Sequence, residues 1–126
     1  MNRILVLDDD PTFGRLVQTV CRLEGYQAEV VPSPEALLPL AREIKPALVL
    51  MDVHYSRRDM LEVLRALRED DTLRDLPVVM TSGMDRRHEC LEAGADAFLM
   101  KPFNPTELLK IIAHFARREE KPDVPA

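Results

Sequence analysis

Short apolar runs alternate with segments of helical periodicity along most of the chain. The runs of strand length cover residues 4–8, 27–31, 47–52, 77–82 and 96–100. Most residues of the first, third and fourth runs are apolar, which is typical of central parallel strands covered on both faces, whereas the second run is mixed, as expected of an edge strand. The alternation predicts five βα units arranged around a parallel sheet.

Three of the intervening segments place apolar residues at positions i, i+3, i+4 and i+7, which predicts one buried helix face in each. The three sets are Phe13, Leu16, Val17 and Val20; Leu37, Leu40, Ala41 and Ile44; and Leu108, Ile111, Ile112 and Phe115. Gly25 is expected to end the first helix in a left-handed conformation, while Ser33 and Pro34 are expected to cap and begin the second. Pro39 should kink that second helix or end its first turn. The segment 84–94 has little periodicity and is expected to be the least stably packed helix.

Composition and charge restrict the class of protein. The chain has 126 residues, of which 46% are hydrophobic, which is enough for one domain with one core. We expect this domain to cover residues 1–118, followed at 119–126 by an unstructured tail or the start of a linker. The net charge of −5 disfavours direct binding to nucleic acid or to anionic membranes.

The expected location follows from the length and surroundings of the apolar runs. None approaches the roughly 20 residues of a transmembrane helix, and acids follow the N-terminal run at once, unlike a signal peptide. We therefore expect a cytoplasmic protein. Cys21 and Cys90 lack CxxC or Cys/His spacing, so both are expected to be reduced and to bind no zinc.

Chemically active side chains follow the predicted strands at their carboxyl ends. Three consecutive carboxylates at 8–10 follow the first strand, Asp52 ends the third, Ser82 ends the fourth and Lys101 follows the fifth. Open parallel sheets bind ligands at this edge. Crowded carboxylates repel one another and raise each other's pKa unless a cation lies among them. The pattern therefore predicts a cation site, a phosphoryl-transfer site, or both.

The same set resembles the receiver domain of two-component response regulators over residues 3–118. The resemblance rests on the acidic pair Asp8 and Asp9, on LVLMDV around Asp52, on PVVMTSG around Ser82 and on FLMKPF around Lys101. It implies a three-layer α/β fold, a doubly wound (βα)5 parallel sheet with the flavodoxin-like strand order 2-1-3-4-5. It also implies that Asp52 is the phosphorylated residue.

The resemblance further implies a magnesium site. A carboxylate that attacks a phosphoryl dianion needs a divalent cation to neutralise charge, and Mg²⁺ suits a site made only of oxygen ligands. The implied protein ligands are Asp9, Asp52 and the backbone carbonyl of His54, with Asp8 acting through water.

Three more roles are implied by the resemblance. Lys101 would neutralise one phosphoryl oxygen and the Ser82 hydroxyl would donate to another. Movement of Ser82 toward the phosphoryl group would let Phe98 swing inward, which would change the face formed by 84–94, 96–100 and the last helix.

The implied partners follow from the same resemblance. The donor would be a sensor histidine kinase or a phosphotransfer protein, and a downstream protein partner would bind the switched face; a homodimer is also compatible. The chain is expected to catalyse only its own phosphorylation and dephosphorylation.

The loop after Asp52 departs from the pattern of receivers. Ser56, Arg57 and Met60 stand where receivers usually carry a proline and two glycines. A methionine in place of a glycine at positive φ costs stability or forces another backbone path. Met84 offers no polar group to orient an attacking water, so we expect a long-lived phosphoryl group.

Three smaller predictions concern the surroundings of the site. Asp10 is expected to begin the first helix, where its charge is favourable. The His54 side chain is expected at the rim of the site. The arginine pairs 57–58 and 86–87 are expected near its mouth, where they would attract an anionic phosphodonor or partner.

Two other hypotheses compete with the receiver. The first acidic stretch also fits the DxDxT pattern of haloacid-dehalogenase-type phosphohydrolases, with Asp8 as nucleophile, Asp10 as general acid/base, and Ser82 or Thr81 with Lys101 as phosphate contacts. That family needs a further acidic cluster after the lysine, which this sequence lacks. The other hypothesis is a receiver fold used as an interaction module without phosphorylation, against which the complete set of acids, hydroxyl and lysine argues.

Overall fold

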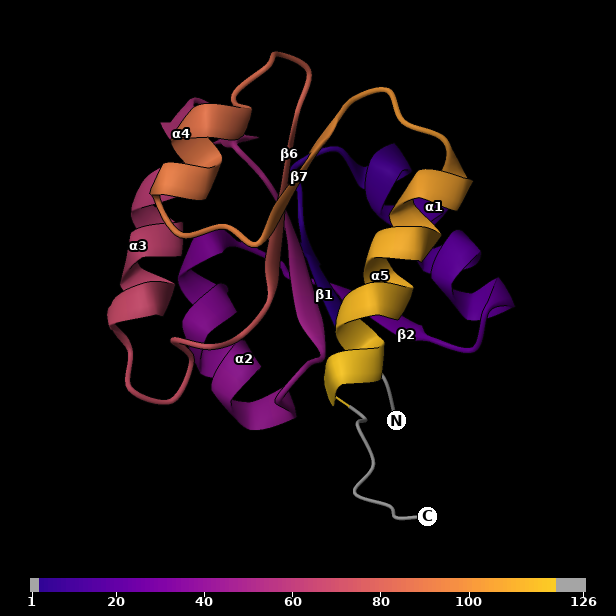
Figure 1. Ribbon diagram of the computed structural model, residues 1–126, viewed down its shortest axis with the longest axis horizontal. Coiled ribbons are helices and arrows are strands. Elements are labelled where there is room, and N and C mark those ends of the chain that lie inside the picture. The colour runs from indigo at the N-terminus through magenta and orange to yellow at the C-terminus, as the bar shows by residue number, and fades with distance from the viewer. Residues whose placement is uncertain (1–2, 120–126) are drawn as a thin grey trace.

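Five parallel strands form the central sheet of the protein, whose computed structural model describes residues 3–119 (Figure 1). They are β1 (Arg3–Leu7), β2 (Gln27–Val30), β3 (Leu48–Asp52), β6 (Val78–Ser82) and β7 (Ala97–Met100). The strand order is β2-β1-β3-β6-β7, so the predicted order 2-1-3-4-5 is confirmed, with β2 at an edge. Each strand lies within one residue of its predicted bounds.

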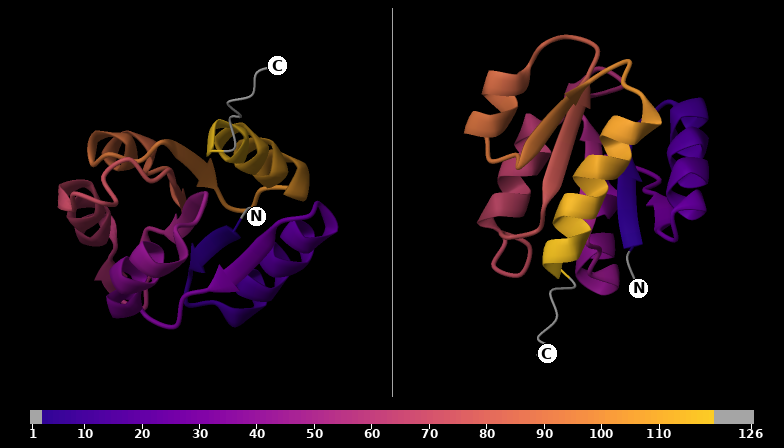
Figure 2. Two further views of the ribbon diagram at one scale, coloured as in Figure 1. Left: turned by 90° about the horizontal axis from the view of Figure 1, so that it is seen from below. Right: turned by 45° about the vertical axis from the view of Figure 1, so that its right-hand side comes forward.

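Helices cover both faces of the sheet and complete three layers (Figures 1 and 2). One face carries α1 (Pro11–Leu23) and α5 (Pro105–Glu119); the other carries α2 (Leu37–Ile44), α3 (Leu61–Glu69) and α4 (Arg87–Glu92). Successive strand residues point to opposite faces. Leu5 and Leu7 accordingly pack under α2 and α3, whereas Ile4 and Val6 pack under α1 and α5.

The buried face of α1 differs from the prediction at Leu16, which is 52% exposed. The buried residues of α1 are Gly14, Val17 and Cys21. This face of α1 can pack against β2 because Gly14 has no side chain. A Cβ atom at Gly14 would lie only 3.1 Å from the Val30 side chain. The predicted faces of α2 and α5 are confirmed.

The turns at the helix ends follow the sequence with one exception. Gly25 has a φ of 85°, as expected after α1. Ser33 is the N-cap residue of a short 3-10 helix, η1 (Pro34–Ala36), which begins with Pro34 and leads into α2, as predicted, but the Ser33 side chain makes no capping hydrogen bond. Pro39 lies in the first turn of α2, where its missing N–H costs no helical hydrogen bond.

The loop after β3 takes another backbone path around Met60. Residues His54–Tyr55 (β4) and Arg58–Asp59 (β5) pair as a small antiparallel hairpin. Met60 has a φ of −83° and is fully buried, so it carries no left-handed strain. The left-handed residue is Ser56, with a φ of 57°.

Two predictions concern the chain ends and membranes. Apart from Glu119 at the end of α5, the predicted tail at 119–126 lies outside the described residues. Among residues 3–119, no helix is both long enough and apolar enough to cross a bilayer.

Arg68 joins the end of α3 to the loops that flank β6. Its guanidinium donates to the carbonyls of Gly94 at 2.8 Å and Leu76 at 2.7 Å and to the Asp96 carboxylate at 2.9 Å. Gly94 has a φ of 112°, and a Cβ atom there would lie 3.0 Å from the Arg68 Cγ. The glycine is therefore required both by its backbone conformation and by the close arginine.

We predict that Gly94→Ala lowers the free energy of unfolding by about 2 kcal/mol or more, because a residue with a Cβ is strained at this φ. Urea denaturation of the native chain and the variant measures the loss. Gly83→Ala is the matched control, since Gly83 has open space around its Cα. Equal urea midpoints for the two variants would contradict the prediction.

Candidate functional site

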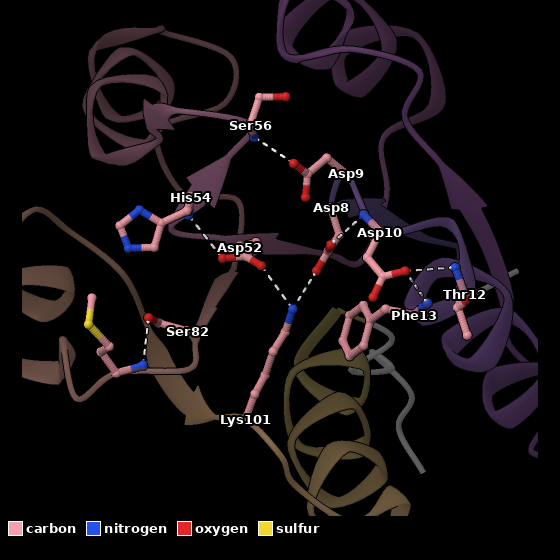
Figure 3. A network of polar contacts seen from close by, with 11 residues as sticks. Asp8, Asp9, Asp10, Thr12, Phe13, Asp52, His54, Ser56, Ser82 and Lys101 are labelled. Atoms are coloured by element: carbon pink, nitrogen blue, oxygen red, sulfur yellow. Dashed lines mark hydrogen bonds and ion pairs between the residues drawn. The ribbon is translucent and has the colours of Figure 1, made fainter.

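An ammonium group lies between two carboxylates at the carboxyl ends of β1 and β3 (Figure 3). Lys101 Nζ donates to Asp8 Oδ2 and to Asp52 Oδ2, each at 2.8 Å. These residues are 93 and 49 positions apart from Lys101 in sequence and meet because β1, β3 and β7 end at the same edge of the parallel sheet. The predicted meeting of these three side chains is confirmed.

Burial and hydrogen bonding shift the pKa values of Asp8 and Lys101 in opposite directions. Burial raises the pKa of Asp8 above its ordinary value, although the Lys101 hydrogen bond lowers it in part. For Lys101, burial alone would lower the pKa, but hydrogen bonds to Asp52 and Asp8 outweigh it and leave the pKa raised. The lysine is therefore charged at neutral pH, and burial makes the ionised form of Asp8 costly to the fold.

The hairpin β4–β5 is tied to the acidic site by two backbone N–H groups. Ser56 N donates to Asp9 Oδ2 at 2.6 Å, and His54 N donates to Asp52 Oδ1 at 2.9 Å (Figure 3). Sequence reasoning missed the Ser56 contact, because a backbone donor leaves no signal in residue type. The hairpin therefore determines where the Asp9 and Asp52 carboxylates lie.

Asp10 caps α1, as predicted. Its Oδ1 accepts from Thr12 N at 3.0 Å and from Phe13 N at 3.5 Å. The carboxylate is thus engaged at the helix N-terminus, away from the ammonium bridge (Figure 3). This position does not suit the general acid/base role that a phosphohydrolase would require of Asp10.

The hydroxyl end of β6 and the aromatic residue of β7 are buried. Ser82 is 1% exposed, and its Oγ accepts from Met84 N at 3.0 Å. Thr81 is fully buried, and its Oγ1 has no hydrogen-bond partner in the structure. Phe98 is 3% exposed, with the Arg87 guanidinium carbon 5.5 Å from its ring centroid. The Phe98 ring is thus already buried in this conformation. The inward movement expected on phosphorylation would need an exposed ring at the start, and the structure does not show one.

The arginine pairs near the site are mostly engaged. Arg58 pairs with Glu35 at 2.7 Å and Glu62 at 3.1 Å. Arg86 pairs with Asp59 at 3.5 Å and with Glu89. The expected cationic patch for an anionic partner is therefore weaker than the sequence suggested.

The rim of the site carries His54 and Met84. The His54 side chain is exposed, as predicted, and its Nε2 lies 3.4 Å from Arg86 Nη1. Met84 is 57% exposed and touches the site through its backbone N–H.

The donor set fits a divalent cation in charge and in chemistry. Asp8, Asp9 and Asp52 carry three negative charges against the single positive charge of Lys101, which leaves two uncompensated. Carboxylate oxygens are ligands that Mg²⁺ prefers. Among residues 3–119, no three acidic, histidine or cysteine side chains already converge as a metal cluster, since Asp9 faces Ser56 while the other two carboxylates face Lys101.

The fold and this edge of the sheet define an α/β domain with an acidic site and a lysine at the carboxyl ends of its parallel strands. The model of the response regulator receiver domain family matches residues 4–113, and the chain belongs to that family. The phosphohydrolase hypothesis is not favoured by this match.

Curated relatives extend well beyond the matched region. The DNA-binding response regulator MtrA of Mycolicibacterium smegmatis is 36% identical over 124 residues, which cover 95% of this chain and 53% of that protein. The DNA-binding dual master transcriptional regulator RpaA of Synechocystis is 30% identical over 124 residues, covering 96% of this chain and 52% of that protein. The chain spans about half the length of these relatives.

A solved structure agrees with the fold. The crystal structure of a putative response regulator from Chloroflexus aurantiacus superposes with a TM-score of 0.85 at 28% identity, covering 93% of this chain and 98% of that one.

We predict that Asp8→Asn stabilises the protein at pH 7. The folded-state pKa of Asp8 is raised above its ordinary value of 3.8, so the stability contributed by its protonated form is present below that value and lost as pH rises through the folded-state pKa. The melting temperature should increase by a few degrees, since roughly 1 kcal/mol corresponds to about 4 °C in a domain of this size.

Thermal melting at pH 7 and pH 4 checks this prediction. The advantage of the variant should shrink as the pH falls toward 4, because a larger fraction of the native carboxyl is then protonated. Asp10→Asn is the control, because asparagine caps a helix as well as aspartate. A variant that melts at or below the native temperature at pH 7 would refute the account of Asp8.

Proposed function

We propose that Asp52 accepts a phosphoryl group from the phosphohistidine of a sensor kinase or a phosphotransfer protein. The observation that carries this proposal is the Lys101 ammonium, which contacts Asp52 and Asp8 at 2.8 Å each. An ammonium in this place neutralises charge that the phosphoryl group brings to a carboxylate-rich site.

The reaction is a transfer between donor imidazole and acceptor carboxylate. The P–N bond of the phosphohistidine breaks, a P–O bond to Asp52 forms, and the imidazole leaves with a proton from solvent. Lys101 then contacts a phosphoryl oxygen. A hydroxyl accepts and donates at once, so Ser82 can keep its bond from Met84 N and donate to a second phosphoryl oxygen.

Asp9, Asp52 and the backbone carbonyl of His54 would hold Mg²⁺, with Asp8 contributing through water. The cation supplies charge neutralisation for the meeting of a carboxylate with a phosphoryl dianion. Asp9 could bind the cation through Oδ1 and keep the hydrogen bond from Ser56 N on Oδ2, because a carboxylate has two acceptor oxygens.

The output surface in this proposal is the face formed by α4, β7 and α5. Arg87 is exposed at this face and lies over the buried ring of Phe98, so a rearrangement at Ser82 on the neighbouring strand β6 would reach Arg87 through Phe98 on β7. A protein partner, or a second copy of the chain, would recognise the changed face. Because the curated relatives carry DNA-binding names, the effector of a longer protein would be a second candidate output.

We expect one phosphoryl group per chain and no multiple turnover. Incubation with acetyl phosphate and Mg²⁺, followed by intact mass, should show one phosphoryl adduct on the native chain and none on Asp52→Asn. Asp10→Asn should be phosphorylated like the native chain, because Asp10 only caps α1.

Two outcomes would defeat the proposal. An adduct that persists in Asp52→Asn would place the acceptor elsewhere. Repeated release of phosphate from small phosphoesters, lost in both Asp8→Asn and Asp10→Asn, would indicate a phosphohydrolase.

We further predict that Met84→Glu shortens the lifetime of the phosphoryl group. Met84 is exposed at the rim and has no polar side-chain atom to orient water, whereas a glutamate carboxylate would accept a hydrogen bond from an attacking water. The expected acceleration is about tenfold, below the roughly 10²–10⁴-fold of a fully positioned general base, because the glutamate would only orient the water. Loss of the adduct with time, measured by intact mass after removal of the donor, gives the rate, and Met84→Gln separates polarity from charge. Equal rates for the native chain and Met84→Glu would contradict this.

A further inference from the structure

Phe13 lies beside the ammonium group of the site. Its ring centroid is 4.2 Å from Lys101 Nζ (Figure 3). Two of the three ammonium protons are engaged by Asp8 and Asp52, and the ring occupies a further side. No motif in the sequence indicated this contact, because Phe13 fits the apolar pattern of α1 equally well.

Phe13 also lines an apolar hollow formed by residues of α1, of α5 and of the segment before α5. Phe13 and Phe103 pack edge to face, with ring centroids 5.9 Å apart. Together with Leu16, Val20, Leu108 and the Lys101 side chain they line a hollow of about 210 Å³. The Phe13 ring is therefore a wall shared by the hollow and the ammonium bridge.

Lysine needs such a contact because its stem is flexible. Holding one rotamer of the four-carbon side chain costs side-chain entropy. Phosphorylation of Asp52 would change the Asp52 oxygen that Lys101 contacts, whereas Asp8 and Phe13 would remain as they are. A cation is attracted to the face of an aromatic ring, and more strongly when it is shielded from water.

We propose that Phe13 is a positioning residue for Lys101, whose ring face holds the ammonium against Asp8 and Asp52. This rests on the proposed function for the role of Lys101 in phosphorylation. Anything that fills the hollow and displaces the Phe13 ring would then change the reactivity of the site from outside it.

Variants at position 13 separate ring chemistry from apolar bulk. Phe13→Leu keeps an apolar side chain and removes the ring, Phe13→Tyr keeps the ring, and a ring-fluorinated phenylalanine keeps the shape but weakens the charge on the ring face. Phe103→Leu is the matched control, because it removes a ring from the same hollow and keeps the Phe13 ring that lies beside Lys101 Nζ. Urea midpoints verify that each variant is folded.

Two measurements on the full chain test the proposal. One is the rate of phosphorylation by acetyl phosphate with Mg²⁺; the other is the NMR order parameter of the Lys101 side chain without donor or metal. Phe13→Leu and the fluorinated variant should slow phosphorylation by about 5- to 30-fold, which corresponds to 1–2 kcal/mol, and should lower the order parameter. Phe13→Tyr and Phe103→Leu should match the native chain in both.

Three results would overturn the proposal: a native rate or a native order parameter in Phe13→Leu, a loss in Phe13→Tyr as large as in Phe13→Leu, or a fluorinated variant that behaves like the native chain. If the native chain takes no phosphoryl group, the proposed function fails, while the order parameters still decide whether Phe13 holds Lys101.

Discussion

The single ammonium of Lys101 between Asp8 and Asp52 is the interaction on which the arrangement of the site depends. It joins the ends of β1 and β3 to the loop after β7, and it is the cation that allows two carboxylates to face each other at a partly buried edge. Without it, the carboxylates would repel one another and be driven to protonate. With Lys101 present, the three carboxylates still outnumber the single positive charge. This excess of negative charge suits a divalent cation, which a reaction that adds a phosphoryl group to the site also requires.

The surroundings of the bridge show how the fold fixes it. The parallel sheet brings the strand ends together, and the hairpin β4–β5 donates N–H groups to the carboxylates of Asp9 and Asp52. Phe13 adds an aromatic face from the first turn of α1. Each of these groups comes from a different element, so the geometry of the site depends on the packing of both helical layers.

Residue type and spacing were sufficient for the five parallel strands and for the meeting of Asp8, Asp52 and Lys101, because parallel topology places strand ends together, but they did not predict the hairpin β4–β5. The predicted burial of Leu16 was wrong. Two overlapping faces of α1 both fit helical periodicity, and the close approach of Gly14 to Val30 determines which of them is buried. They could not show that Arg58 and Arg86 are engaged by acids far away in sequence. The Ser56 contact was invisible because it is made by the backbone. The roles of Ser82, Phe98 and the His54 carbonyl stay predictions from the resemblance.

The central claim is that the Lys101 ammonium is held by both carboxylates before any phosphoryl group arrives. Side-chain NMR of the native chain at neutral pH, without metal or donor, tests it through hydrogen-bond correlations from Lys101 Nζ to the carboxyl carbons of Asp8 and Asp52. The account predicts both correlations. A Lys101 ammonium that shows neither, and that moves as freely as an exposed lysine, would contradict it.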